Sequence, residues 1–284
     1  MIRKALLFVN FILFFCLAGV AQKAGNNVKS LVEADESLNF ALFRTGVPNA
    51  FLKYAADNAL IFQPAPVSIH TNFKKTKQKD SGEDLEWKPE YARISKKADL
   101  GFTSGRFELT ELGKKKFGVY LNVWKNENGK WKLLYHAKTF QPQLIRETKF
   151  DYFEPKNQEF YKLIGPQKTQ MRDDIVFGTD ELFGKRLGSK NGNKYFSEFY
   201  DTNVRIYFPD KYPTYSLEES LNFILKNKLT FKSEPKGVLR AFSGDLAFTY
   251  GEATVSGKQY EYIRAWQIEE ATGKWNVIID MYME

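Results

Sequence analysis

The chain has 284 residues, a formal net charge of +8 and a single cysteine, Cys16. One cysteine excludes a framework of intramolecular disulfides and a thiolate metal cluster. The lysine runs at 74–79 and 114–116 stand beside Gly, Ser, Asp and Glu without the aromatic-plus-basic pattern of a nucleic-acid motif. They predict solvated loops, and we expect no nucleic-acid partner.

The first residues have the three parts of a secretory signal peptide. Arg3 and Lys4 precede an apolar run, which small residues follow up to Ala21. We therefore expect cleavage after Ala21 and an exported product, periplasmic or extracellular, with no retained membrane anchor. One alternative is a retained anchor, for which the apolar run is short. Another is a lipoprotein anchor through Cys16, although Phe15 stands where a lipobox has a small residue.

Two helices are predicted next. Residues 28–43 place leucines and alanines on one helical face, and Gly46 ends the pattern. Residues 48–56 begin at Pro48, a favoured residue in the first turn of a helix.

Strands follow the helices. The segment ALIFQP predicts a strand that ends at Pro64, and residues 86–97 predict a helix or an irregular segment. Asn128-Gly129 is a strong signal for a two-residue hairpin turn. Three runs have the pattern of strands: 99–109, 117–125 and 131–139.

This pattern occurs twice along the chain. The segment DLGFTSGRFEL at 99–109 recurs as DLAFTYGEATV at 245–255, and residues 50–64 align with 195–209 at an offset of 145. A repeat of this length is the size of a domain, not of a solenoid unit. Each copy has helices first and then a largely antiparallel sheet, so the predicted fold class is α+β.

The segment between the two copies matches neither of them. Three prolines interrupt it, but its five Phe and Tyr residues are too many for a free linker, so we expect it to pack across the domain junction. The predicted parts are a signal peptide at 1–21, a first domain at 22–140, an aromatic-rich connector at 141–170 and a second domain at 171–284.

The order of these segments resembles the nuclear-transport-factor-2-like cone fold, in particular its SnoaL-like and ketosteroid-isomerase-like branch in secreted bacterial domains of unknown function. The resemblance covers residues 28–140 and, more weakly, 171–284. It implies two tandem cone-shaped domains, each a curved, mostly antiparallel sheet wrapped around N-terminal helices. Proteins with this fold include isomerases, cyclases, dehydratases and non-enzymatic binding modules. The resemblance is carried by Asp57, Ala59, Phe62, Pro64, Trp87, Pro89, Asp99, Leu100, Gly101, Gly105, Tyr120, Trp124, Gly129 and Trp131.

The isomerase mechanism implied by the resemblance can be tested on these residues. Such enzymes place a general-base aspartate just before the proline that ends the first strand, and here Gln63 and Phe208 occupy that position. The acid that donates to the oxyanion would stand near Asn122 and Arg264, where there is no carboxyl group. Because the reaction needs both groups, we do not expect steroid-type isomerisation, and the sequence favours a protein that is not an enzyme.

The sequence gives little support to a metal site or a phosphate-binding site. His70 and His136 are the only histidines, too few for a metal cluster, and no phosphate-binding glycine loop is present. We therefore expect no metal and no cofactor.

Aromatic and polar residues alternate on matched strands of the two copies. Strand periodicity places each set on one face, where it forms either the wall of a small-molecule pocket or ordinary packing against the helices. His136 and Asp280 occupy equivalent positions and are the candidate catalytic groups if there is a reaction. The candidate pocket residues are Phe62, Tyr120, Asn122, Trp124, His136, Tyr207, Tyr250, Tyr262, Arg264, Trp266 and Asp280.

Two functions remain open from the sequence. The first is non-catalytic: two cones packed as an intramolecular pseudo-dimer bind a small apolar or amphipathic molecule in one cone, or contact another protein. The alternative is a SnoaL-like lyase, isomerase or hydrolase that uses His136 or Asp280 together with Tyr120 or Tyr262. A closed interior filled by side chains favours a purely structural or interaction role, and an open cavity in which His136 or Asp280 converges on tyrosine hydroxyls favours the enzyme.

Overall fold

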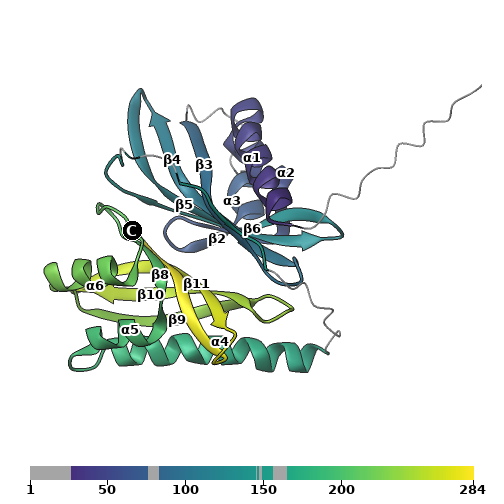
Figure 1. Cartoon of the computed structure of the whole chain (residues 1–284). Coiled ribbons are helices and arrows are strands. Elements are labelled where there is room, and N and C mark those ends of the chain that lie inside the picture. Colours follow the sequence, from purple (N-terminus) through teal and green to yellow (C-terminus); the bar gives the residue numbers. More distant parts are fainter. Residues whose placement is uncertain (1–26, 76–82, 145, 147–148, 156–164) are drawn as a thin grey trace, which may run out of the picture.

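The computed structural model describes residues 27–75, 83–144, 146, 149–155 and 165–284 (Figure 1). The expected signal peptide and Cys16 lie outside the described residues. Among the described helices, none is long and apolar enough to cross a membrane.

The first half of the chain forms a sheet with helices on one face. The strands are ordered β2-β1-β6-β5-β4-β3-β7, with β1 parallel to β6 and β7 parallel to β3, and the other pairs antiparallel. The helices are α1 (Val28–Thr45), α2 (Val47–Tyr54) and α3 (Ile69–Lys75). The strands are β1 (Ala55–Phe62), β2 (Pro66–Ser68), β3 (Glu83–Ile94), β4 (Leu100–Glu111), β5 (Lys114–Glu127), β6 (Lys130–Phe140) and β7 (Asp151–Phe153).

The second half repeats the same arrangement. Its strand order, β8-β12-β11-β10-β9, corresponds strand by strand to β1-β6-β5-β4-β3, and β8 is again parallel to the last strand. The helices are α4 (Pro166–Leu187), a 3-10 turn (Gly192–Tyr195), α5 (Phe196–Phe199) and α6 (Leu217–Lys226). The strands are β8 (Tyr200–Tyr207), β9 (Phe231–Arg240), β10 (Leu246–Val255), β11 (Lys258–Glu269) and β12 (Lys274–Met283). The predicted α+β class with two curved sheets, each preceded by helices, is confirmed.

One predicted element is wrong. Residues 86–97 were expected to form a helix or an irregular segment, but most of them belong to β3. Trp87 is buried and its neighbours Glu86 and Lys88 are exposed, which is the two-residue period of a strand. The register shifts between Pro89 and Tyr91, and this bulge lets a proline stand within a paired strand.

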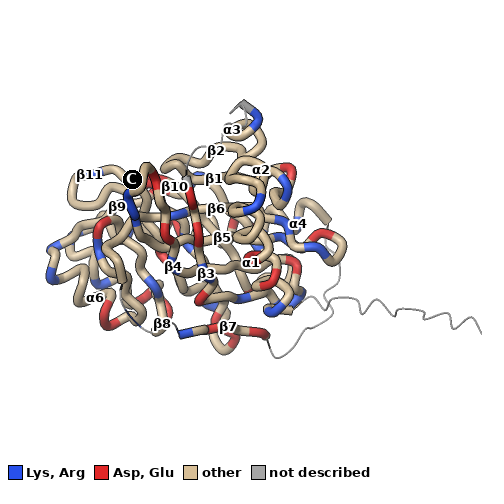
Figure 2. The backbone as a smooth tube through the Cα atoms, turned by 90° about the horizontal axis from the view of Figure 1, so that it is seen from above, with Lys and Arg blue, Asp and Glu red and all other residues tan. Residues whose placement is uncertain are grey.

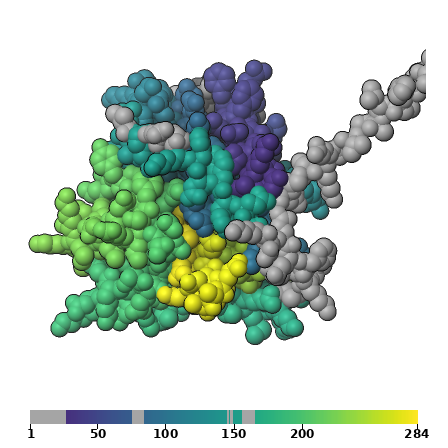
Figure 3. Space-filling view, in the orientation of Figure 1, coloured from purple at the N-terminus to yellow at the C-terminus, as the bar shows by residue number. Residues whose placement is uncertain are grey.

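Each sheet packs its helices on one face and the other sheet on the opposite face. Figure 1 shows α1–α3 and α4 on the outer sides of the two sheets, and Figure 3 shows the two halves in close contact. One apolar cluster joins the inner faces and includes Leu121 of β5 and Ile263 of β11. The rings of Phe102 and Phe248, which are equivalent in the repeat, meet across this contact with centroids 6.1 Å apart.

The turns before β4 and β10 exchange hydrogen bonds across the same contact. The Asp99 carboxylate accepts from the backbone N–H of Phe242 at 2.7 Å, and the Asp245 carboxylate accepts from the backbone N–H of Lys96 at 3.0 Å. An offset of 146 relates Asp99 to Asp245 and also Lys96 to Phe242. Such a reciprocal exchange is typical of a two-fold symmetric interface, here between the halves of one chain.

Candidate functional site

The interior of the first cone holds a carboxyl group with four hydrogen-bond donors. Asp35 of α1 is fully buried. Its Oδ2 accepts from Trp87 Nε1 at 2.9 Å and from the Tyr120 hydroxyl at 2.8 Å. Its Oδ1 accepts from Thr103 Oγ1 at 2.6 Å and from Asn122 Nδ2 at 2.8 Å. Burial raises the pKa of Asp35 above its usual value, against these four hydrogen bonds, which lower it.

His136 extends this network. Because Asn122 donates its amide N–H to Asp35, its amide oxygen must accept from His136. The His136 Nδ1 atom lies 2.7 Å from Asn122 Oδ1, so the histidine proton is on Nδ1. The imidazole packs against the rings of Phe51 and Trp87, with centroids 4.8 and 5.6 Å apart. Burial, and secondarily Lys138, lowers the pKa of His136 to about 3. The histidine is therefore neutral at physiological pH.

The second cone has an ionic network at the equivalent positions. Arg264 of β11 is fully buried between Asp180 of α4 and Asp280 of β12. Its Nη1 donates to Asp180, and its Nε donates to Asp280 at 3.1 Å. The Tyr200 and Tyr282 hydroxyls donate to Asp280 Oδ2 at 2.6 and 3.0 Å. Burial lowers the pKa of Arg264, but the two carboxylates outweigh burial and hold the pKa well above its usual value.

The candidate residues from the sequence fall into three groups. Tyr120, Asn122, Trp124 and His136 lie together in the first cone, and Tyr262, Arg264, Trp266 and Asp280 lie together in the second. The third group lies between the two sheets: Phe62 packs on Tyr250 with ring centroids 5.4 Å apart, and Ser104 and the Tyr207 hydroxyl, at the equivalent positions, are 3.5 Å apart. The last group therefore belongs to the interface and not to a cone interior.

The sequence reasoning missed the helical partner in each network. Asp35 and Asp180 supply the central carboxylates, and their matching offset of 145 in the repeat was the signal that could have found them. It also missed Tyr200 and Tyr282, which have no matching tyrosine in the first copy.

The candidate polar side chains in the interiors of both cones are buried. Asn122, Arg264 and Asp280 have no exposed surface, and 2% of His136 is exposed. Each of these side chains is hydrogen-bonded within its own network. Among the described residues, no group of three or more His, Cys, Asp or Glu side chains could hold a metal ion.

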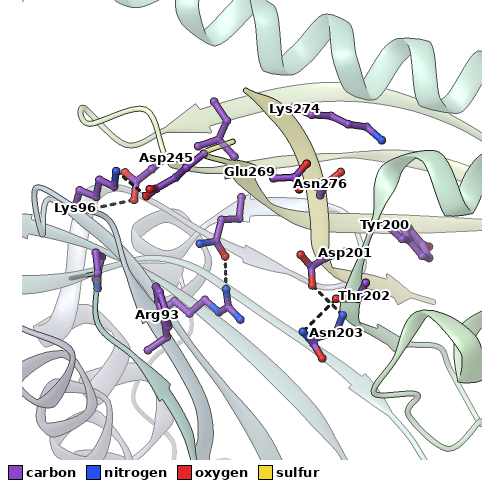
Figure 4. A pocket seen from close by; sticks show the side chains of 15 residues that line it. Arg93, Lys96, Tyr200, Asp201, Thr202, Asn203, Asp245, Glu269, Lys274 and Asn276 are labelled. Atoms are coloured by element: carbon purple, nitrogen blue, oxygen red, sulfur yellow. Dashed lines mark hydrogen bonds and ion pairs between the residues drawn. The ribbon is translucent and has the colours of Figure 1, made fainter. Parts of the chain in front are cut away.

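A cavity of about 680 Å³ lies instead between the two halves (Figure 4). Residues of both halves line it, together with Phe153 and Pro155 of the connecting segment. The wall from the first half includes Arg93, whose guanidinium donates to Gln267 of the second half. The other lining residues are Lys96, Tyr200, Asp201, Thr202, Asn203, Asp245, Ile268, Glu269, Glu270, Lys274 and Asn276. We call this space the inter-domain cavity.

A second cavity of about 330 Å³ lies along β3, β4 and β5 of the first sheet, where Gln141–Leu144 pass over it. Its wall mixes apolar side chains, such as Phe117 and Val119, with the Arg106 guanidinium. Arg106 donates to the buried Glu90 carboxylate at 2.5 Å, so its charge is compensated.

No family model and no curated protein matches the chain. Solved structures match a portion the size of one cone. An NTF-2 like protein of unknown function from Shewanella oneidensis is 12% identical, with a TM-score of 0.34, over 39% of this chain and 96% of that chain. An LEH-like epoxide hydrolase from M. tuberculosis is 10% identical, with a TM-score of 0.32, over 39% and 83%. A CaMKII hub from S. rosetta is 16% identical, with a TM-score of 0.33, over 41% and 98%.

These structures are similar to the chain in fold alone at such identities. One of them is an NTF-2 like protein, which is the fold that the sequence resemblance implies.

Proposed function

We propose that the protein is an exported, non-catalytic binding protein, built as an intramolecular pseudo-dimer of two cones, and that its small-molecule ligand occupies the inter-domain cavity. One observation carries the proposal. The predicted pocket residues inside the cones are buried and hydrogen-bonded, whereas open space of about 680 Å³ lies at the junction. That volume is in the range of small-molecule sites, roughly 300–1,000 Å³.

The reciprocal contacts of Asp99 and Asp245 support the pseudo-dimer. A fused second copy holds its partner at high effective concentration, so the junction is formed in every molecule. A ligand site between the halves is therefore present without assembly of separate chains.

The geometry gives no support to the alternative of an enzyme. A general base must be within reach of its substrate, but the His136 side chain is buried. Asp280 is fully buried as well, and three donors, Arg264 and two tyrosines, already occupy its carboxylate.

Native mass spectrometry of the protein purified from its own host tests the proposal. We expect a retained small molecule on the wild-type protein and its loss in Asn276→Trp, which places an indole ring in the inter-domain cavity. Lys132→Trp is the matched control, because Lys132 is the equivalent residue of the first cone and does not line the cavity. A ligand that stays bound to the Asn276→Trp variant would place the site elsewhere and overturn the proposal.

A further inference from the structure

We infer that the inter-domain cavity recognises an uncharged, polyhydroxylated molecule, that is, a carbohydrate. This inference rests on the proposed function and adds the chemical class of the ligand. Its basis is a difference between the two copies at the wall of the cavity.

The strand register defines that wall. On the hairpin of β11 and β12, Gln267 lies directly opposite Asn276, and Glu269 lies directly opposite Lys274. Because side chains alternate along a strand, these four share one face. Ala265 and Ile263 lie on the same face of β11 and pack against the first sheet. The wall is thus the polar end of the face that packs the two halves together (Figure 4).

The first copy has a different charge at the same four positions. There Lys125 lies opposite Lys132, and Glu127 lies opposite Lys130, in the same register. The formal charge of the four side chains is +2 in the first copy and zero in the second. The copy that lines the cavity therefore has two neutral amides in place of two lysines.

This replacement changes which ligand the wall can bind. Two lysines would attract an anion, whereas an amide has both a donor and an acceptor. A hydroxyl group also donates and accepts, so a wall of amides and carboxylates matches a molecule with several hydroxyls. Asp201 and Asn203 of β8 continue this mixture at the right of Figure 4.

Three basic and four acidic residues line the cavity, so their formal charges nearly balance. Lys96 is 2.7 Å from Glu270, and the Asp245 carboxylate accepts from the Ser243 hydroxyl and from a backbone N–H. Basic and acidic residues are also interspersed along both halves of the described chain in Figure 2, which shows no field of one sign. The cavity therefore has no strong preference for an anion or a cation.

Arg93 and Phe153 add a flat surface. The Arg93 guanidinium lies 5.1 Å from the centroid of the Phe153 ring and donates to Gln267 Oε1. With its oxygen engaged, Gln267 has its amide N–H groups available to a ligand. A weakly hydrated guanidinium and an aromatic ring can pack against the C–H face of a sugar ring.

The test is a binding screen of the purified protein against immobilised neutral, acidic and sulfated glycans, followed by calorimetry of each hit. Triglycine and palmitate serve as zwitterionic and amphipathic probes. We expect a neutral glycan to bind, with an affinity that changes less than about twofold between 0.05 and 0.5 M salt. Binding only by acidic glycans, triglycine or palmitate, or by none of the probes, would overturn the carbohydrate class.

Matched variants connect the glycan with the wall. Asn276→Lys restores the lysine of the first copy, and we expect it to weaken neutral-glycan binding by roughly tenfold or more. The mirror variant Lys132→Asn should leave binding unchanged. Gln267→Lys is a second variant, and thermal unfolding checks that each variant is folded. Unchanged glycan binding by both folded lysine variants would also contradict the inference.

The two proposals can fail separately. If the ligand found by mass spectrometry is lost in Asn276→Trp but is not a carbohydrate, the site stands and the ligand class is wrong. If a neutral glycan binds equally well to Asn276→Trp, the proposed site is wrong.

Discussion

The interiors of the two cones have the same scaffold but satisfy their buried carboxylates in different ways. Both have an aspartate on the helix, at Asp35 and Asp180, hydrogen-bonded to a tyrosine of the sheet at 2.8 Å. In the first cone the remaining donors to this aspartate are uncharged side chains, and in the second cone a guanidinium lies between two carboxylates. A single backbone arrangement therefore accommodates two ways of satisfying a buried carboxylate.

In the second network, three of the side chains that differ from the first contact one another, and Tyr200 and Tyr282 differ as well. Asn122 corresponds to Arg264, and His136 corresponds to Asp280, which supplies the second carboxylate. Trp87 corresponds to Ser233, whose hydroxyl accepts from the Arg264 guanidinium at 3.1 Å. The smaller side chain of Ser233 leaves room for the guanidinium, so the three differences form one unit.

The largest expected effect comes from removing the charge at the centre of the second network. Arg264→Met leaves two buried carboxylates without compensation, and we expect it to lower the free energy of unfolding by about 3–5 kcal/mol. The equivalent Asn122→Leu removes a neutral hydrogen-bond bridge and should cost about 1–3 kcal/mol. Urea unfolding at pH 7 measures both. Equal losses would show that the two interiors do not differ as described.

The stability of the protein should depend on pH because His136 is buried in its neutral form. Its pKa is lowered to about 3 in the folded protein, below the usual 6.5, so the unfolded chain binds the extra proton between these values. This contribution to stability is present above pH 6.5 and is lost as the pH falls towards 3, by about 1.4 kcal/mol per pH unit.

The variant His136→Asn isolates this contribution. Urea unfolding at several values between pH 4 and 6 should give a shallower loss of stability with falling pH in the variant than in the wild-type protein. The raised pKa of Asp35 acts with the opposite sign, but it is present in both proteins. Parallel pH profiles would mean that His136 is not the buried neutral group described above.

A smaller effect tests whether the three differing positions act as one unit. In the first cone, we expect each of the single variants Asn122→Arg, His136→Asp and Trp87→Ser to destabilise the folded protein. Each substitution alone leaves a buried neighbour without its proper contact. The triple variant should be more stable than the sum of the three losses predicts, by about 0.5–3 kcal/mol. Additive losses in urea unfolding would contradict the coupling.

Much of the fold could be predicted from the sequence because the two copies of the repeat can be compared with each other. Matched segments in the same order indicated two domains of one kind, and the hairpin at Asn128-Gly129 was confirmed, with both residues at positive φ. The error at 86–97 arose because Pro89 and charged residues obscured a strand whose bulge follows from pairing with β4.

The site was harder to predict, since its parts meet only in the tertiary structure. Strand periodicity identified Tyr120 and Asn122 as neighbours, but it could not show that Asp35 on a helix accepts from both. The inter-domain cavity depends on how two sheets pack, and Arg93 meets a residue 174 positions away. No local pattern in the sequence contains that contact.

The interface provides the counterpart to the unequal interiors, because there the aspartate and its main-chain contact are the same in both copies, although the serine that donates to each aspartate stands at a different position. Asp99 accepts from Ser95 Oγ at 2.7 Å and from the opposite turn, and Asp245 accepts from Ser243 Oγ at 2.5 Å and from its own opposite turn. We expect Asp99→Ala and Asp245→Ala each to lower the free energy of unfolding at pH 7 by about 1 kcal/mol or somewhat more, since each removes two hydrogen bonds. Because the contact is reciprocal, the two losses should agree within about 0.5 kcal/mol, unlike those of Arg264 and Asn122. A large loss for one aspartate and none for the other would show that the junction is not two-fold symmetric in energy, even though it is symmetric in geometry.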